Sequence, residues 1–174
     1  MRIRAFARAH RRLVAGGAVF LLGFAVFVVV WFQPQKIFLE STVHEAAPVT
    51  SVVPSSSTQS AAAAAEVASG RFRSLEHRTV GRARLIRLSD GSHVLRIENL
   101  DTSNGPDLRV YLSELPSNLG WRDYGEKYLE LGKLKGNRGD QNYRVPGRVD
   151  VTKYQSVVIW CVRFKVGFGV APLA

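Results

Sequence analysis

Cysteine is nearly absent from this sequence of 174 residues, because Cys161 is the only one. A single cysteine excludes an internal disulfide and also excludes a lipid-modified cysteine near the N-terminus. Three uses of Cys161 stay open. It is a buried and inert side chain, a redox-active or ligand-holding thiol, or one half of an intermolecular disulfide.

Sequence motifs for several common chemistries are absent as well. The chain has no G-x-x-x-x-G-K-[ST] phosphate loop, and no glycine elbow or oxyanion motif surrounds Cys161. Of the four histidines, only His77 and His93 follow residue 70, and each lies near a turn, where we expect surface histidines. The sequence therefore favours a non-enzymatic module without a metal site. Asp and Asn residues whose spacing fits no calcium loop instead favour turns: Asp101, Asn104, Asp107, Asp140 and Asn142.

Negative charge is missing from the N-terminus. Residues 1–12 contain five arginines and no acid, and residues 13–32 contain no charge. Twenty helical residues span about 30 Å, the thickness of a bilayer core, and Trp31 and Phe32 are typical of its interface. The positive-inside rule predicts a cytoplasmic tail (1–12), a transmembrane signal anchor (13–32) and an extracytoplasmic remainder, hence a single-pass protein of the cell membrane. A cleaved signal peptide is the alternative, but residues 33–36 offer no small-residue cleavage site.

Large aromatic residues are missing from residues 40–69, where Val, Ser, Thr, Pro and Ala dominate. Such a composition cannot bury enough apolar surface to offset the entropy of the chain. We therefore expect residues 33–69 to form a flexible spacer, with residues 61–67 at most transiently helical. About thirty flexible residues let a domain range about 30 Å from its anchor.

Residues 70–174 carry 18 basic and 11 acidic side chains. A basic excess can mark a nucleic-acid interface, but here the basic residues alternate with apolar ones, as in residues 82–87, and no nucleic-acid motif accompanies them. This spacing is typical of the solvent-facing side of half-buried strands, so we expect no nucleic-acid partner. A basic domain tethered to a membrane can instead lie against anionic lipid headgroups.

A period of two residues dominates the sequence from Gly70 onwards. Runs of alternating apolar and polar residues are separated by turn signals such as Asp90-Gly91, and no convincing helix occurs. The pattern predicts an all-β domain over residues 70–174, an antiparallel β-sandwich or barrel. The expected strands are 71–75, 79–88, 93–100, 108–113, 128–131, 143–145, 156–164 and 165–170.

The run 156–164 is apolar on both faces, with Cys161 on one side and Trp160 on the other. A strand with two apolar faces lies in the middle of a covered sheet. We therefore expect Cys161 in a central strand. Arg163 falls on the same strand face, about 7 Å further along, and a nearby cation favours a reactive thiolate.

Seven segments agree in order and spacing with one known family. They are residues 104–112 (NGPDLRVYL), 132–143 (GKLKGNRGDQNY), Pro146, 154–161 (YQSVVIWC), Phe164, 168–169 (FG) and Ala171. They resemble the DM-thirteen domain, an electron-transfer module, over about residues 69–173.

This resemblance implies an all-β extracytoplasmic domain whose characteristic cysteine, here Cys161, works in redox chemistry. The cysteine would act as a bare thiol or hold a prosthetic group such as haem, and a protein redox partner is implied. Trp160 and Tyr143, within the resembling segments, are further candidates for cofactor binding. Animal members occur beside DOMON domains, and these 174 residues contain none.

Three functional hypotheses follow. The first is a membrane-anchored electron-transfer domain with Cys161 as its working group. The second is a non-catalytic binding or envelope-structural module with a buried structural cysteine. The third is a domain that binds the lipid surface through its basic excess.

Overall fold

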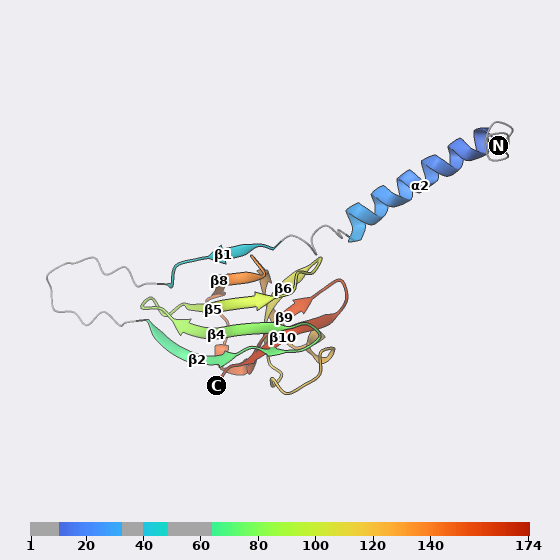
Figure 1. The fold of residues 1–174 in the computed structure, drawn as a ribbon. Coiled ribbons are helices and arrows are strands. Elements are labelled where there is room, and N and C mark those ends of the chain that lie inside the picture. Colours follow the sequence, from blue (N-terminus) through green and yellow to red (C-terminus); the bar gives the residue numbers. More distant parts are fainter. Residues whose placement is uncertain (1–10, 33–39, 49–63) are drawn as a thin grey trace, which may run out of the picture.

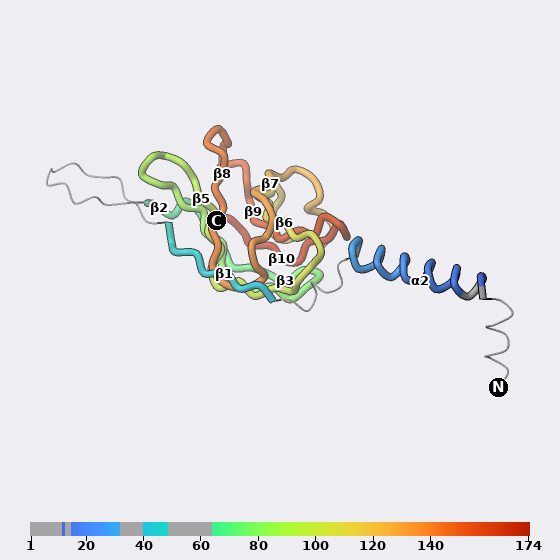
Figure 2. The backbone as a smooth tube through the Cα atoms, turned by 90° about the horizontal axis from the view of Figure 1, so that it is seen from above, coloured from blue at the N-terminus to red at the C-terminus, as the bar shows by residue number. Residues whose placement is uncertain are grey.

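The computed structural model describes residues 11–32, 40–48 and 64–174 (Figure 1). Residues 64–174, together with the short segment 40–48, form a sandwich of two five-stranded sheets. Helix α2 (Arg11–Phe32) precedes this sandwich and extends away from it (Figure 2). The predicted β-sandwich is therefore confirmed, although one of its sheets is mixed rather than purely antiparallel.

Helix α2 covers the segment for which the sequence predicts a transmembrane anchor. Among the residues that the structure describes, no helix meets both the length and the apolarity needed to cross a membrane.

The first sheet is mixed. Its strands, in spatial order, are β1 (Thr42–His44), β8 (Arg138–Val145), β5 (His93–Thr102), β4 (Thr79–Arg87) and β2 (Ala65–Arg71). β1 runs parallel to β8, and the other neighbours are antiparallel.

The second sheet is antiparallel throughout. Its strands, in spatial order, are β3 (Arg73–Ser74), β10 (Val166–Pro172), β9 (Ser156–Cys161), β6 (Leu108–Ser113) and β7 (Tyr128–Lys133). β9 is the middle strand of this sheet, as its two apolar faces predict. Two short 3-10 helices, η2 (Asp123–Gly125) and η3 (Val151–Lys153), lie in the connections.

The main core lies between the two sheets. Alternation along each strand points one set of side chains inward, so that Leu95 and Ile97 of β5 and Ile159 of β9 are fully buried in one cluster. A second, smaller core lies on the other face of the second sheet. It contains Trp160 and Val158 of β9, packed with residues from the connection before β7.

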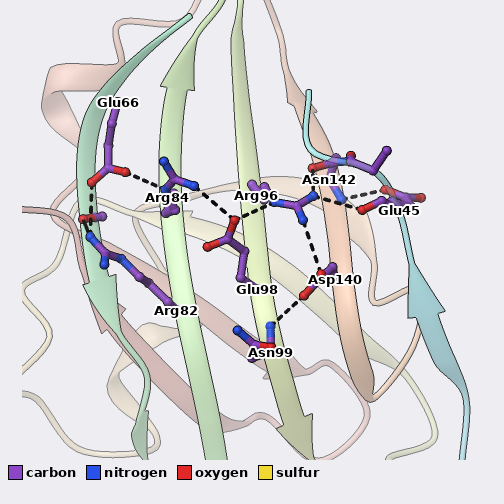
Figure 3. A network of polar contacts seen from close by, with 11 residues as sticks. Glu45, Glu66, Arg82, Arg84, Arg96, Glu98, Asn99, Asp140 and Asn142 are labelled. Atoms are coloured by element: carbon purple, nitrogen blue, oxygen red, sulfur yellow. Dashed lines mark hydrogen bonds and ion pairs between the residues drawn. The ribbon is translucent and has the colours of Figure 1, made fainter. Parts of the chain in front are cut away.

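The arginines of β4 confirm the expected solvent-facing pattern. Ala83 and Leu85 are buried in the main core, while Arg82 and Arg87 are exposed. Arg84, on the outer face, bonds to acidic side chains of the neighbouring strands, as Figure 3 shows. Part of the basic excess is thus neutralised within the first sheet.

The predicted spacer over residues 33–69 is wrong at two places. Residues 42–44 form β1, and residues 65–69 begin β2, so residues 65–67 are extended rather than helical. Backbone hydrogen bonds to β8 and β4 hold these two segments in the sheet. Such pairing stabilises a strand without large apolar side chains. Residues 33–39 and 49–63 of the predicted spacer lie outside the described residues.

Strand boundaries differ from the prediction where the chain turns. The expected strand 71–75 is divided because the chain passes from the first sheet to the second at Phe72, whose side chain is buried. β8 begins at Arg138 rather than at Tyr143. β9 ends at Cys161 rather than at Phe164, because residues 162–165 form the turn into β10, with Lys165 in the left-handed region at φ 55°.

Truncation of a side chain in the middle strand tests this packing. Ile159→Ala should lower the free energy of unfolding by about 2–5 kcal/mol, because it leaves a cavity in the main core. Val162→Ala, on the exposed turn after β9, should change it by less than about 0.5 kcal/mol. Urea unfolding of both variants measures the difference, and equal effects would contradict the assignment of β9 to the core.

Candidate functional site

Cys161 is the last residue of β9, and its thiol is free. Its side chain is 0% exposed and belongs to the main core between the sheets. In the register of the sheet it lies between Leu108 of β6 and Val166 of β10. The predicted place of Cys161 in a central, covered strand is confirmed.

Arg163 does not lie on the strand face of Cys161, contrary to the expectation from alternation. Because β9 ends at Cys161, Arg163 belongs to the turn and is exposed. Its guanidinium donates a hydrogen bond to the carbonyl oxygen of Trp31 in α2 and lies 5.5 Å from that residue's ring centroid. The guanidinium of Arg163, which the sequence predicts beside Cys161, therefore contacts α2 instead.

Trp160 points to the opposite face of the sheet, as predicted. It belongs to the second core, 5% exposed, with its ring centroid 6.3 Å from that of Tyr111. The ring of Tyr111 in turn stacks on Tyr128, at 3.9 Å and an interplanar angle of 3°. Tyr128 is 41% exposed. These three residues, which we call the aromatic column, lead from the backbone beside Cys161 to the surface.

A hollow of about 480 Å³ opens beside the aromatic column. All three rings contribute to its wall, together with charged residues of both signs, including Arg122 and Lys165. Burial, followed by the contact with Tyr128, raises the pKa of Tyr111. Its phenol therefore stays protonated throughout the physiological range.

Tyr143 lies on β8, in the main core but on the opposite sheet from Cys161. Its hydroxyl donates to the side-chain oxygen of Gln141 at 2.6 Å and accepts from the backbone N–H of Lys135 at 3.1 Å. Gln141, fully buried, also donates to the carbonyl oxygen of Gly136 at 2.8 Å. Burial raises the pKa of Tyr143. These contacts hold the loop before β8, so they give Tyr143 a structural task.

The three candidate residues do not converge on one cofactor site. Cys161 and Tyr143 face the main core from different sheets, whereas Trp160 faces the second core. Cys161 lines none of the three main cavities of the described part of the chain. A prosthetic group such as haem needs an open apolar pocket at its ligand, so the residues present do not fit a group held by Cys161.

Sequence reasoning missed a second hollow, of about 490 Å³, at one end of the sandwich. Gly105 and Pro106 line it on one side, and Asn137 lines it on another. His77, expected on the surface, is half-buried there, with its ring centroid 3.9 Å from that of Phe168. The signal was present in the two turn-rich segments 104–107 and 136–140, but only folding brings them together.

The acidic residues weighed as calcium ligands are engaged with arginines. Asp101 pairs with Arg78 at 2.6 Å, and Asp107 pairs with Arg109 at 2.8 Å. The Arg78 and Arg109 guanidinium groups, respectively, lower the pKa of these carboxyls.

The fold and the position of the thiol define a β-sandwich module with one cysteine buried in its main core. A family profile described as electron transfer DM13 matches residues 71–173, more than half of the chain. The chain therefore belongs to the DM13 family, and the resemblance in the sequence is confirmed. No curated protein and no solved structure matches the chain.

The burial of Cys161 predicts its reactivity. In the folded protein a thiol-specific probe should react with Cys161 at least about 100-fold more slowly than in denaturant, because the probe must wait for the core to open. A Phe164→Cys, Cys161→Ala double variant is the matched control, since Phe164 is 57% exposed. Fast labelling of native Cys161 would show that the sulfur is accessible.

Proposed function

We propose that this chain is a membrane-anchored, extracytoplasmic member of the DM13 family that takes part in electron transfer, with Cys161 as its redox group. The observation that carries the proposal is the family match over residues 71–173, combined with the burial of the single cysteine at the end of the middle strand of its sheet.

The burial of Cys161 limits the kind of redox chemistry. Thiol–disulfide exchange requires direct attack by one sulfur on another, and a sulfur that is 0% exposed does not admit a second one in the folded state. An electron, by contrast, passes through packed protein over short distances without contact between the reacting atoms. The proposal is therefore a one-electron transfer at a distance.

The aromatic column supplies the route. Trp160 is covalently next to Cys161, and the rings of Tyr111 and Tyr128 continue from it to the surface. A one-electron acceptor on a partner protein takes an electron at Tyr128, within the hollow beside the column. The electron comes from Cys161: the thiol loses one electron to the acceptor and one proton to water that enters when the core opens locally, and becomes a thiyl radical. A one-electron donor protein and a proton from water then restore the thiol, so that each cycle returns the protein to its starting state.

The anchor is proposed from the sequence of residues 13–32 and the arginines before it. The helix that covers this segment exposes large apolar side chains, among them Phe20 at 72%, Leu22 at 68% and Val30 at 67%. An exposed apolar surface of this kind fits contact with lipid or with a partner protein. We therefore propose that residues 1–12 are cytoplasmic and that the sandwich is extracytoplasmic.

The full chain, mixed with an outer-sphere one-electron oxidant such as hexachloroiridate(IV) in a stopped-flow instrument, tests the proposal. We expect a fast phase in which the wild-type protein delivers one electron, and its loss in Cys161→Ala. Tyr111→Phe should slow this phase about ten-fold or more, because phenylalanine is harder to oxidise; a ten-fold change corresponds to about 1.4 kcal/mol in the barrier.

Tyr154→Phe is the matched control, since Tyr154 packs against the main core and lies outside the aromatic column. It should leave the fast phase unchanged. A fast phase that persists in Cys161→Ala would exclude Cys161 as the redox group.

The burial of Cys161 also favours a second candidate function, a non-catalytic binding or envelope-structural module. A cysteine that is 0% exposed among apolar side chains behaves as a small hydrophobe. In that case Cys161→Ala would lower stability, as other core truncations do, and the number of electrons delivered would stay the same.

A further inference from the structure

β1 is a strand contributed by a segment outside the family match. The match begins at residue 71, whereas β1 covers Thr42–His44 and lies along the outer edge of β8 (Figure 1). The two strands are parallel, with Thr42 opposite Arg138 and His44 opposite Asp140. Without β1, β8 would therefore be the edge strand of the first sheet, and β1 covers that edge.

Main-chain groups hold the segment along this edge. The backbone N–H of Glu45 donates to the carbonyl oxygen of Asp140 at 2.9 Å, and that of Arg138 donates to the carbonyl oxygen of Ser41 at 3.2 Å. The backbone N–H of Ser41 donates to the side-chain oxygen of Asn137 at 2.7 Å. This is the pattern by which an extended peptide adds a strand to an exposed sheet edge.

A side chain and a backbone group of the domain also bind the carboxylate of Glu45. Its carboxylate accepts from Lys135 Nζ at 2.7 Å and from the backbone N–H of Asn142 at 2.7 Å. The Lys135 ammonium lowers the pKa of this carboxyl. Asn142 also donates from its side chain to the carbonyl oxygen of Ala46 at 2.8 Å, so the contacts continue beyond the strand itself.

Arg96 of β5 bonds both to this segment and to acidic side chains of the sheet (Figure 3). Its side chain is 6% exposed, and it donates to the carbonyl oxygen of Glu45 at 3.1 Å. It also pairs with Glu98 at 2.8 Å and Asp140 at 3.3 Å. A buried guanidinium needs partners for its donors, and one of them comes from the segment.

Two glycines of the domain leave room for the segment. A Cβ on Gly136 would lie 2.5 Å from the carbonyl oxygen of Ser41, and one on Gly139 would lie 2.1 Å from that of Val43. Gly139 has φ +94° as well, a conformation that favours glycine. Both glycines fall inside the family match, whereas the backbone atoms that a Cβ would meet there belong to Ser41 and Val43, outside it.

We propose that the edge of β8 is a binding site for an extended peptide with a glutamate at the position of Glu45, and that its ligand is residues 40–48 of this same chain. We call residues 40–48 the strap. The contacts of the strap are those expected of a bound ligand: main-chain pairing for affinity, and Lys135 and Arg96 for recognition.

Binding of the strap limits the distance between the sandwich and its membrane anchor, an inference that rests on the proposed anchor. With the strap bound, seven residues separate Phe32 from Glu40, and a chain of that length spans at most about 27 Å. With the strap released, the connection runs from Phe32 to Ala64 and extends to about 110 Å. Binding at β8, rather than the length of the predicted spacer, then sets how far the sandwich lies from its anchor.

A cleavable full-length chain tests the site without any redox measurement. A protease recognition sequence inserted between residues 49 and 63 separates the strap and α2 from the sandwich after folding. We expect the two pieces to stay together on size-exclusion chromatography in detergent. An excess of free peptide with the sequence of residues 40–48 should release them, and the same peptide with Glu45→Ala should be about ten-fold weaker or more.

Gly139→Val should abolish the association, because its side chain occupies the place of the Val43 backbone. Gly91→Val is the matched control, since Gly91 also has a positive φ of +81° and a Cβ there has nothing within 4 Å, and it should keep the pieces together. Glu45→Ala in the chain itself changes the strap alone, so weaker association in that variant does not depend on how the sandwich tolerates Gly139→Val.

Immediate separation of the wild-type pieces, or their retention in Gly139→Val, would overturn the proposal. A dimer before cleavage that becomes monomeric with excess peptide would contradict the assignment of the strap to the same chain. It would show that the strap at β8 comes from a second copy. Because this experiment measures association alone, failure of the stopped-flow test described above would overturn the proposed electron transfer and leave the strap site standing.

Discussion

The burial of β9 on both faces is the constraint on which the rest of the structure depends. One face packs against the first sheet across the main core, and the other packs against the connection that covers the second core. A strand in that position tolerates neither charge nor solvent. The groups that it carries, including the thiol of Cys161 and the indole of Trp160, are therefore held in fixed places, with the thiol fully shielded from solvent.

That constraint separates the two kinds of redox chemistry that a cysteine can perform. Reactions in which sulfur forms a bond need access to the sulfur, and the core denies it. Transfer of an electron alone needs only short gaps, and the aromatic column provides rings 3.9 and 6.3 Å apart, centroid to centroid, between the surface and the residue beside Cys161. The alternating directions of β9 thus place the sulfur and the column on opposite faces of one strand.

The first sheet shows how a segment of low hydrophobicity becomes part of a fold. The strap contains no large aromatic side chain, and by composition it does not form a core. It is ordered because β8 offers unpaired backbone groups, because Gly136 and Gly139 let its backbone approach, and because Glu45 meets Lys135. These are contacts between residues about 90 positions apart in the sequence, so the folded sandwich extends beyond the region of family similarity.

The sequence by itself determined the all-β sandwich, the alternation of the arginines in β4, the central place of Cys161 and the family. Each of these depends on a local period or a motif, that is, on residues that lie close together in the sequence. Only the tertiary structure decided that Trp160 joins Tyr111 and Tyr128, that Arg163 turns away from Cys161, and that residues 42–44 add a strand to β8. Those outcomes depend on which distant segments meet, and on where a strand stops at a turn, and no local pattern encodes either one.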